Sequence, residues 1–131
     1  MKQVAKAIIH QDGKFLLQLR ENRPDIPYPN CWSFFGGELE EKETPWEALQ
    51  RELCEELEWY PEFGNFLWVL NDHNNSSVIH LFSVPFTGDP ENLALHEGQA
   101  FNWFQTLEIK NNVNIHILVL KNLQLFEKNH K

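Results

Sequence analysis

The stretch from Gly36 to Trp59 constrains the fold most, because it combines a strong helix-start signal with a high density of acidic residues. It holds nine of the nineteen acidic residues of the chain. Thr44 is a suitable N-cap, Pro45 suits the first helical position, and Glu47 completes a capping box. Apolar residues then recur at helical spacing: Trp46, Leu49, Leu53 and Leu57. The pattern predicts a helix that ends near Leu57 and packs its apolar stripe on a sheet.

Three carboxylates fall on a face that adjoins this stripe. Glu52, Glu55 and Glu56 stand at i, i+3 and i+4, so they lie within about 100° of one another around the helix. Like charges at this spacing destabilise a helix, whereas a divalent cation stabilises them. Carboxylate oxygens suit Mg²⁺, which often bridges protein acids to substrate phosphates. The alternative interpretation is an ordinary solvated face of a Glu-rich helix.

The rest of the chain alternates strand patterns with loops. Two strand-like runs flank Asp12-Gly13, a strong hairpin signal. Residues 21–32 contain three prolines and no periodicity, which predicts an irregular loop. Further strand patterns cover 66–72, 76–86 and 100–105, and residues 117–126 have an approximately helical pattern. Strands, one central helix and a terminal helix predict a single α/β layer structure.

Composition narrows the class of protein. A chain of 131 residues with 42% hydrophobic and 13% aromatic residues is large and apolar enough for one globular domain. Its net charge of −8 argues against stable binding to nucleic acids and against binding to anionic membranes. We expect a cytoplasmic location, because there are only two cysteines and no long apolar run. The six histidines show no metal-ligand spacing.

The acidic segment also resembles a known motif. Gly37, five residues, Glu43, seven residues and then the run Arg51 to Glu56, RELCEE, reproduce the Nudix box. This resemblance implies an α/β/α sandwich with a mixed central sheet, one domain over 1–131, and a box at 37–59. It also implies hydrolysis of a nucleoside diphosphate-linked substrate, with Mg²⁺ as the cofactor and Mn²⁺ as a possible substitute.

Family roles carry over by position. Glu52, Glu55 and Glu56 match the metal-binding glutamates, with the carbonyl of Gly36 as a further ligand. Gly37 and the pair of Arg51 with Glu43 match the structural part of the box.

Three positions depart from the family pattern. Glu58 stands where the box has glycine, Phe35 where many members have proline, and Lys42 where many have glycine. A non-glycine residue at 58 predicts either a longer helix or a strained left-handed residue.

A later loop, HEGQAFNWF, resembles the small bacterial mutator-type nucleoside triphosphate pyrophosphohydrolases. Glu97 matches a glutamate that reaches the metal in those enzymes, and Asn114 more loosely matches a base-reading asparagine. Glu52 is the first candidate for the general base and Glu97 the second. Arg20 and Arg23 are candidates for binding phosphate oxygens, with plain surface arginines as the alternative. Trp32, Phe35 and Trp103 are candidates for stacking on a base.

We expect a (d)NTP or an oxidised dNTP as substrate, cleaved to nucleoside monophosphate and pyrophosphate. The alternatives are a nucleotide sugar or another nucleoside diphosphate derivative, or a non-catalytic nucleotide-binding regulatory domain. The oligomeric state is left open by the sequence.

Overall fold

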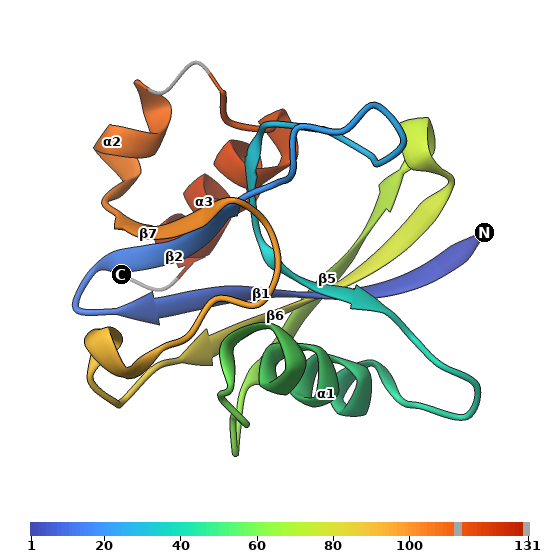
Figure 1. Ribbon diagram of the computed structural model, residues 1–131, viewed down its shortest axis with the longest axis horizontal. Coiled ribbons are helices and arrows are strands. Elements are labelled where there is room, and N and C mark those ends of the chain that lie inside the picture. The colour runs from blue at the N-terminus through green and yellow to red at the C-terminus, as the bar shows by residue number, and fades with distance from the viewer. Residues whose placement is uncertain (112–113, 130–131) are drawn as a thin grey trace.

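In the computed structural model, which describes residues 1–111 and 114–129, the chain folds into a mixed β-sheet with helices on both faces (Figure 1). The strands are β1 (Lys2–Gln11), β2 (Lys14–Leu19), β3 (Trp32–Ser33), β4 (Phe35–Glu38), β5 (Asn65–Asp72), β6 (Ser77–Pro85) and β7 (Ala100–Phe104). The helices are α1 (Pro45–Leu57), α2 (Thr106–Lys110) and α3 (Ile117–Asn129), with 3-10 turns η1 (His73–Asn75) and η2 (Pro90–Asn92). The predicted α/β class with a mixed sheet is confirmed.

Strand β1 is the centre of the sheet. It pairs antiparallel with β2 and β4 and parallel with β6, which makes the sheet mixed. The predicted hairpin between β1 and β2 is present, with Gln11 opposite Lys14. Asp12 and Gly13 both have positive φ, at 51° and 77°, as a tight two-residue hairpin turn requires.

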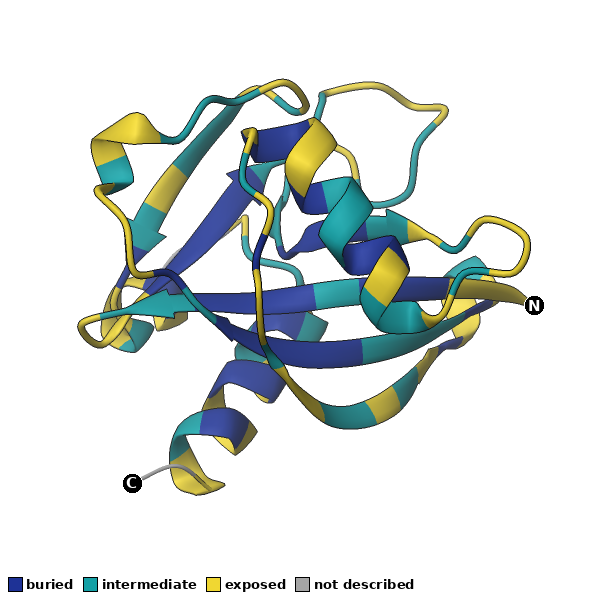
Figure 2. Ribbon diagram, turned by 90° about the horizontal axis from the view of Figure 1, so that it is seen from below, coloured by how far each residue is buried: buried dark blue, intermediate teal, exposed yellow. Residues whose placement is uncertain are grey.

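Alternation along β1 separates two apolar cores. Ala5, Ala7 and Ile9 belong to the cluster that α1 covers, whereas Ile8 belongs to the cluster that α3 covers. Figure 2 shows buried residues concentrated along the central strands, and exposed positions on the outer sides of the helices. One face of the sheet thus supports α1, and the opposite face is covered only partly by α3.

Helix α1 starts as the sequence predicts. The Thr44 hydroxyl accepts from the Glu47 amide at 3.2 Å, and the Glu47 carboxylate accepts from the Thr44 amide at 2.9 Å. Leu49, Leu53 and Leu57 of the predicted stripe are completely buried. This packing fixes the direction in which the glutamates on the adjoining face project.

The end of α1 settles the alternatives at Glu58. The helix stops at Leu57, and Glu58 adopts the left-handed conformation with φ 54° and ψ 37°. Its amide still donates to the carbonyl of Cys54 at 3.0 Å. The residue therefore forms the cap that a glycine usually forms, at the steric cost of a side chain.

Glu58→Gly is therefore expected to raise the free energy of unfolding by up to about 1 kcal/mol, because glycine adopts this conformation without the Cβ clash. Activity should stay within about threefold of wild type. Urea denaturation of Glu58→Gly and Glu58→Ala measures the effect. Alanine removes the carboxylate but keeps the Cβ, so it should give no such gain. If Glu58→Gly were less stable than wild type, the proposed steric strain at Glu58 would be wrong.

The structure differs from the sequence prediction in two segments. Helix α2 was not expected, although Gln105 and Glu108 form its capping box: the Gln105 amide donates to Glu108 at 2.8 Å. Short strands β3 and β4 lie where the sequence was interpreted as a loop and an aromatic-rich segment. Their residues are held by pairing with β2 and β1, a long-range contact that local patterns do not reveal. Within the described residues, no helix has the length and apolarity needed to span a membrane.

Candidate functional site

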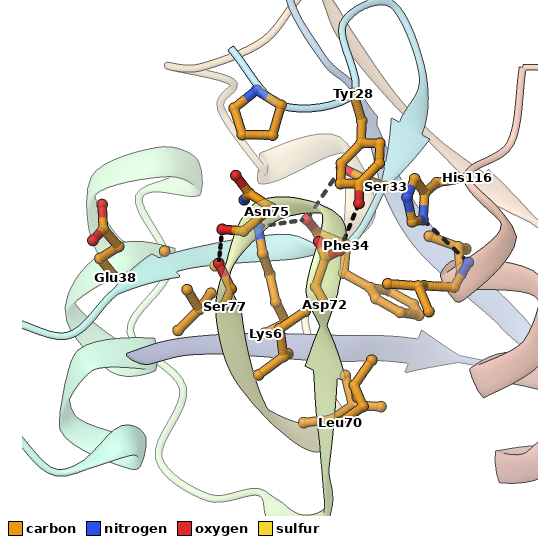
Figure 3. Close-up of a pocket in the computed structure, with 18 of the residues that line it drawn as sticks. Lys6, Tyr28, Ser33, Phe34, Glu38, Leu70, Asp72, Asn75, Ser77 and His116 are labelled. Atoms are coloured by element: carbon orange, nitrogen blue, oxygen red, sulfur yellow. Dashed lines mark hydrogen bonds between the residues drawn. The ribbon is translucent and has the colours of Figure 1, made fainter. Parts of the chain in front are cut away.

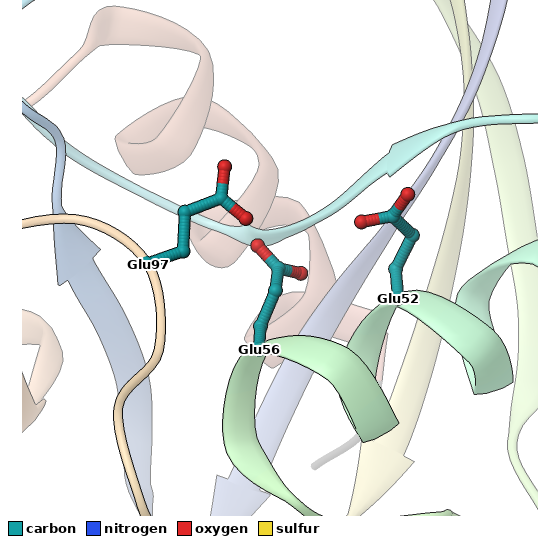
Figure 4. A group of neighbouring side chains, drawn as sticks. All are labelled: Glu52, Glu56 and Glu97. Atoms are coloured by element: carbon teal, nitrogen blue, oxygen red, sulfur yellow. The ribbon is translucent and has the colours of Figure 1, made fainter.

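Three glutamates from two segments meet beside the sheet. Glu52 and Glu56 project from successive turns of α1, and Glu97 comes from the loop between η2 and β7 (Figure 4). One carboxylate oxygen from each lies within 4.8 Å of the other two. We call these three residues the acidic cluster.

Glu56 is the buried member of the acidic cluster, with 2% of its surface exposed. Its Oε1 accepts from the amide of Gly36 at 3.2 Å, whereas Oε2 has no hydrogen-bond partner among the described residues. Burial, together with Glu97 and against the attraction of Lys6, raises the pKa of Glu56 to about 9. A buried carboxylate oxygen without a donor, beside two further carboxylates, fits a divalent cation.

The raised pKa predicts how the metal-free protein responds to pH. The environment of the folded state raises the pKa of Glu56 from its ordinary value of 4.5 to about 9, so the folded state should retain a proton that the unfolded state loses. Stability should fall as pH rises between these values. Glu56→Gln lacks this proton. From pH 5 to 7.5 its stability relative to wild type should improve by about 3 kcal/mol in urea titrations with EDTA. If the stabilities of wild type and Glu56→Gln changed in parallel with pH, the raised pKa of Glu56 would be wrong.

The Arg51 side chain links Glu52 to Glu43. The Arg51 guanidinium donates to Glu52 Oε1 at 2.9 Å and binds both oxygens of Glu43, at 2.8 and 2.9 Å. These bonds hold the pKa of Glu43 below its ordinary value and raise that of Arg51. Burial raises the pKa of Glu52, against the effect of Arg51. The predicted pairing of Arg51 with Glu43 is thus present, and it also orients Glu52.

Gly36 and Gly37 let strand β4 approach both β1 and the acidic cluster closely. A Cβ on Gly37 would lie 2.5 Å from the carboxyl carbon of Glu52. A Cβ on Gly36, where φ is 142°, would lie 2.0 Å from the carbonyl oxygen of Ala5. Any side chain at either position would displace β4 or the Glu52 carboxylate.

The loop carrying Glu97 is tied to the end of α1. The His96 amide donates to the Glu56 carbonyl at 2.9 Å, and the Ala94 amide donates to the Leu57 carbonyl at 3.4 Å. The His96 ring also contacts the Glu58 carboxylate, with Nε2 2.5 Å from Oε2. The two backbone bonds place Glu97 beside Glu56, although the two residues lie far apart in the sequence.

Glu55 occupies a different position from the other predicted metal ligands. Its side chain is exposed and lies 3.5 Å from the Arg51 guanidinium. The structure does not bring it into the acidic cluster.

A pocket of about 410 Å³ extends from the cluster across the face of the sheet that α3 partly covers. Glu52, Glu97, Gly36 and Gly37 line one part. Tyr28, Asp72 and His116 line another, which Figure 3 shows. The pocket therefore joins an acidic end to a region of aromatic and hydrogen-bonding groups.

The second part of the pocket is a hydrogen-bonded aromatic group. The Tyr28 hydroxyl donates to Asp72 Oδ1 at 2.6 Å, and burial together with Asp72 raises the pKa of Tyr28 to about 12. The Tyr28 and His116 rings meet edge to face at 3.7 Å between centroids. His116 Nδ1 accepts from the Leu118 amide at 3.1 Å, and burial lowers its pKa, which favours the neutral ring. The neutral ring then carries its proton on Nε2.

The predicted substrate-binding residues lie in different places. Arg20 lines the pocket, and its Nε donates to the Pro27 carbonyl at 2.8 Å. Arg23 is exposed, forms an ion pair with Asp25 at 2.6 Å, and is not a lining residue. Asn114 is exposed; its carbonyl accepts from the Trp32 amide at 2.9 Å, and it does not line the pocket.

None of the three candidate stacking aromatics lines the pocket. Phe35 is completely buried, Trp103 packs on the α1 core, and Trp32 packs on Phe104. Sequence reasoning missed Lys6, Tyr28, Asp72 and His116. Tyr28 lay in the proline-rich loop, where a long irregular segment was itself a signal for binding residues. The other three lie in strand or helix-start patterns that carry no such signal.

Comparison with known proteins agrees with the geometry. The family model described as the NUDIX domain matches residues 1–123. A CTP pyrophosphohydrolase of Escherichia coli (strain K12) is 35% identical over 103 residues, which span 79% of this chain and 75% of that protein. An ADP-ribose pyrophosphatase of Methanocaldococcus jannaschii is 34% identical over 82 residues, spanning 63% of this chain and 47% of that protein.

A solved structure supports the fold independently. The MutT protein from Methanosarcina mazei Go1 superposes with a TM-score of 0.86 over 99% of this chain and 95% of that one, at 19% identity. The chain belongs to the NUDIX domain family and is a hydrolase that acts on pyrophosphate bonds.

Proposed function

We propose that this protein hydrolyses a (d)NTP, oxidised or ordinary, to a nucleoside monophosphate and pyrophosphate in a Mg²⁺-dependent reaction. The observation that carries the proposal is the acidic cluster, with the unpaired Oε2 of buried Glu56, at one end of a pocket of nucleotide size. The phosphate chain then lies beside the cluster and the base towards Tyr28, Asp72 and His116.

Glu52, Glu56 and Glu97 are the residues that hold the metal in this proposal, with Mn²⁺ as a substitute for Mg²⁺. Glu55 and the carbonyl of Gly36 stay candidate ligands from the family resemblance. Bound Mg²⁺ neutralises the charge that develops on the phosphate chain during hydrolysis. Glu52 or Glu97 accepts a proton from the attacking water, and Arg51 keeps the Glu52 carboxylate in place for this step.

The nucleoside is proposed from the relatives and from the pocket. The E. coli relative is named a CTP pyrophosphohydrolase, so cytidine triphosphates are the first substrates to test. Asp72 supplies an acceptor and His116 a donor, groups that read the edge of a base. The M. jannaschii relative is named an ADP-ribose pyrophosphatase, which keeps nucleoside diphosphate derivatives as the second candidate class.

A nucleotide panel with Mg²⁺ tests the proposal. CTP, dCTP, the other NTPs and dNTPs, oxidised dNTPs, ADP-ribose and nucleotide sugars are assayed for monophosphate, pyrophosphate and orthophosphate. We expect a triphosphate to give monophosphate and pyrophosphate, without orthophosphate as first product. Preferred hydrolysis of ADP-ribose or a sugar nucleotide would favour the second class. Tight binding without hydrolysis, with Mg²⁺ or Mn²⁺, would support a regulatory binding domain instead.

A further inference from the structure

A lysine on the central strand faces the same pocket as the acidic cluster. Lys6 lies on β1 opposite Gly36 of β4 and beside Leu81 of β6, and it lines the pocket (Figure 3). The amide of Gly36 in turn binds Glu56. Lys6 therefore lies on the sheet side of the pocket, and the neighbouring strand β4 connects it to the acidic cluster through Gly36.

The ammonium group of Lys6 has donors to spare. In the described part of the chain it makes one long hydrogen bond, 3.5 Å to the Phe34 carbonyl, and no carboxylate lies within ion-pair distance. An ammonium group carries three donors, and Lys6 is half-buried in the pocket wall, so water fills the donor positions that the protein leaves open. An anionic group that enters the pocket can take the place of this water.

The charges around Lys6 indicate which partner. Burial lowers its pKa, whereas Glu56, Glu97 and Glu52 raise it and Arg20 lowers it. Lys6 is thus close enough to interact with all three members of the acidic cluster and with the pocket arginine. When the three carboxylates of the acidic cluster are engaged by a cation, the phosphate chain of a substrate that enters the pocket supplies an anion for Lys6.

We propose that Lys6 binds a phosphate group of the substrate beside the acidic cluster, an inference that rests on the proposed function. Its ammonium group donates to a phosphate oxygen from the strand side of the pocket, opposite the carboxylates. Lys6 is then a substrate-binding residue with two opposed effects. It favours the anionic substrate, and it disfavours a divalent cation that binds alone.

Two titrations with Lys6→Met test this. Mn²⁺ alone is followed by electron paramagnetic resonance. The bis-methylene analogue of tripolyphosphate, which has no nucleoside and is not hydrolysed, is followed by calorimetry at saturating Mn²⁺. We expect Mn²⁺ alone to bind about threefold or more tightly, and the analogue to bind at least about tenfold more weakly. Lys6→Arg should keep most of the analogue affinity, and Lys14→Met, an exposed residue outside the pocket, controls for net charge.

Unchanged analogue affinity in Lys6→Met would overturn the proposal, as would an equal loss in Lys14→Met. Weaker Mn²⁺ binding in a folded Lys6→Met protein would also overturn it, because Lys6 would then support the cluster itself. Lys6→Gln provides the same comparison if the methionine variant does not fold. The analogue lacks a base, so these titrations test Lys6 even if the wild-type protein hydrolyses no triphosphate, a result that would reject the proposed function alone.

Discussion

Glu56→Gln is expected to lower kcat with Mg²⁺ by at least about a thousandfold while the protein stays folded. Gln preserves the shape of the side chain and still accepts the bond from the Gly36 amide, so the packing around α1 has no reason to change. What it removes is a carboxyl group that can give up its proton to a cation and so present a negative charge at the buried centre of the acidic cluster. Mn²⁺ binding, followed by electron paramagnetic resonance, and the rise in Tm with added Mg²⁺ should be lost together with activity.

Two variants make this result specific. Glu55 was predicted as a ligand of the same rank, but it is exposed and bound to Arg51, so Glu55→Gln should lose less, about tenfold to a hundredfold. Glu41→Gln removes an exposed acid from the loop before α1 and should leave both metal binding and turnover near wild type. Full activity in Glu56→Gln, with unchanged Mg²⁺ dependence, would reject the metal assignment.

The box and its helix were predictable because they depend on neighbours in the sequence. Capping by Thr44, burial of the leucine stripe and the bond between Arg51 and Glu43 all follow from spacings of ten residues or fewer. The fixed offsets of the motif also led to the correct family. The one-domain organisation over 1–131 and a cytoplasmic location stay predictions.

What could not be predicted depends on strand pairing. Lys6 faces the pocket because β1 pairs with β4 and β6, and Asp72 does so because β5 pairs with β6. In the sequence, Lys6 is an ordinary polar position in an apolar strand. Arg23 lies outside the pocket, where a nearby aspartate at position 25 binds it, as the alternative of a surface arginine expects. Local charge patterns do not distinguish a residue that faces substrate from one paired with its neighbour.

Glu52→Gln is expected to lower kcat by about a thousandfold and Glu97→Gln by about a hundredfold, each with a smaller change in KM. Burial raises the pKa of Glu52, which makes its carboxylate a stronger base, and Arg51 and Gly37 fix its orientation. Glu97 belongs to a loop tied to α1 mainly through backbone contacts, and its carboxylate is exposed.

The pH dependence of kcat identifies which of the two acts as base. A base must be ionised, so activity should fall as pH drops through the pKa that the base has in the metal-bound protein. If Glu52 is the base, the residual activity of Glu52→Gln should lose this dependence, while Glu97→Gln keeps it. A larger kcat loss in Glu97→Gln, with the acidic limb abolished there instead, would transfer the role to the loop. That outcome would make the backbone bonds from His96 and Ala94 to the end of α1 part of the catalytic geometry, because they hold Glu97 beside Glu56.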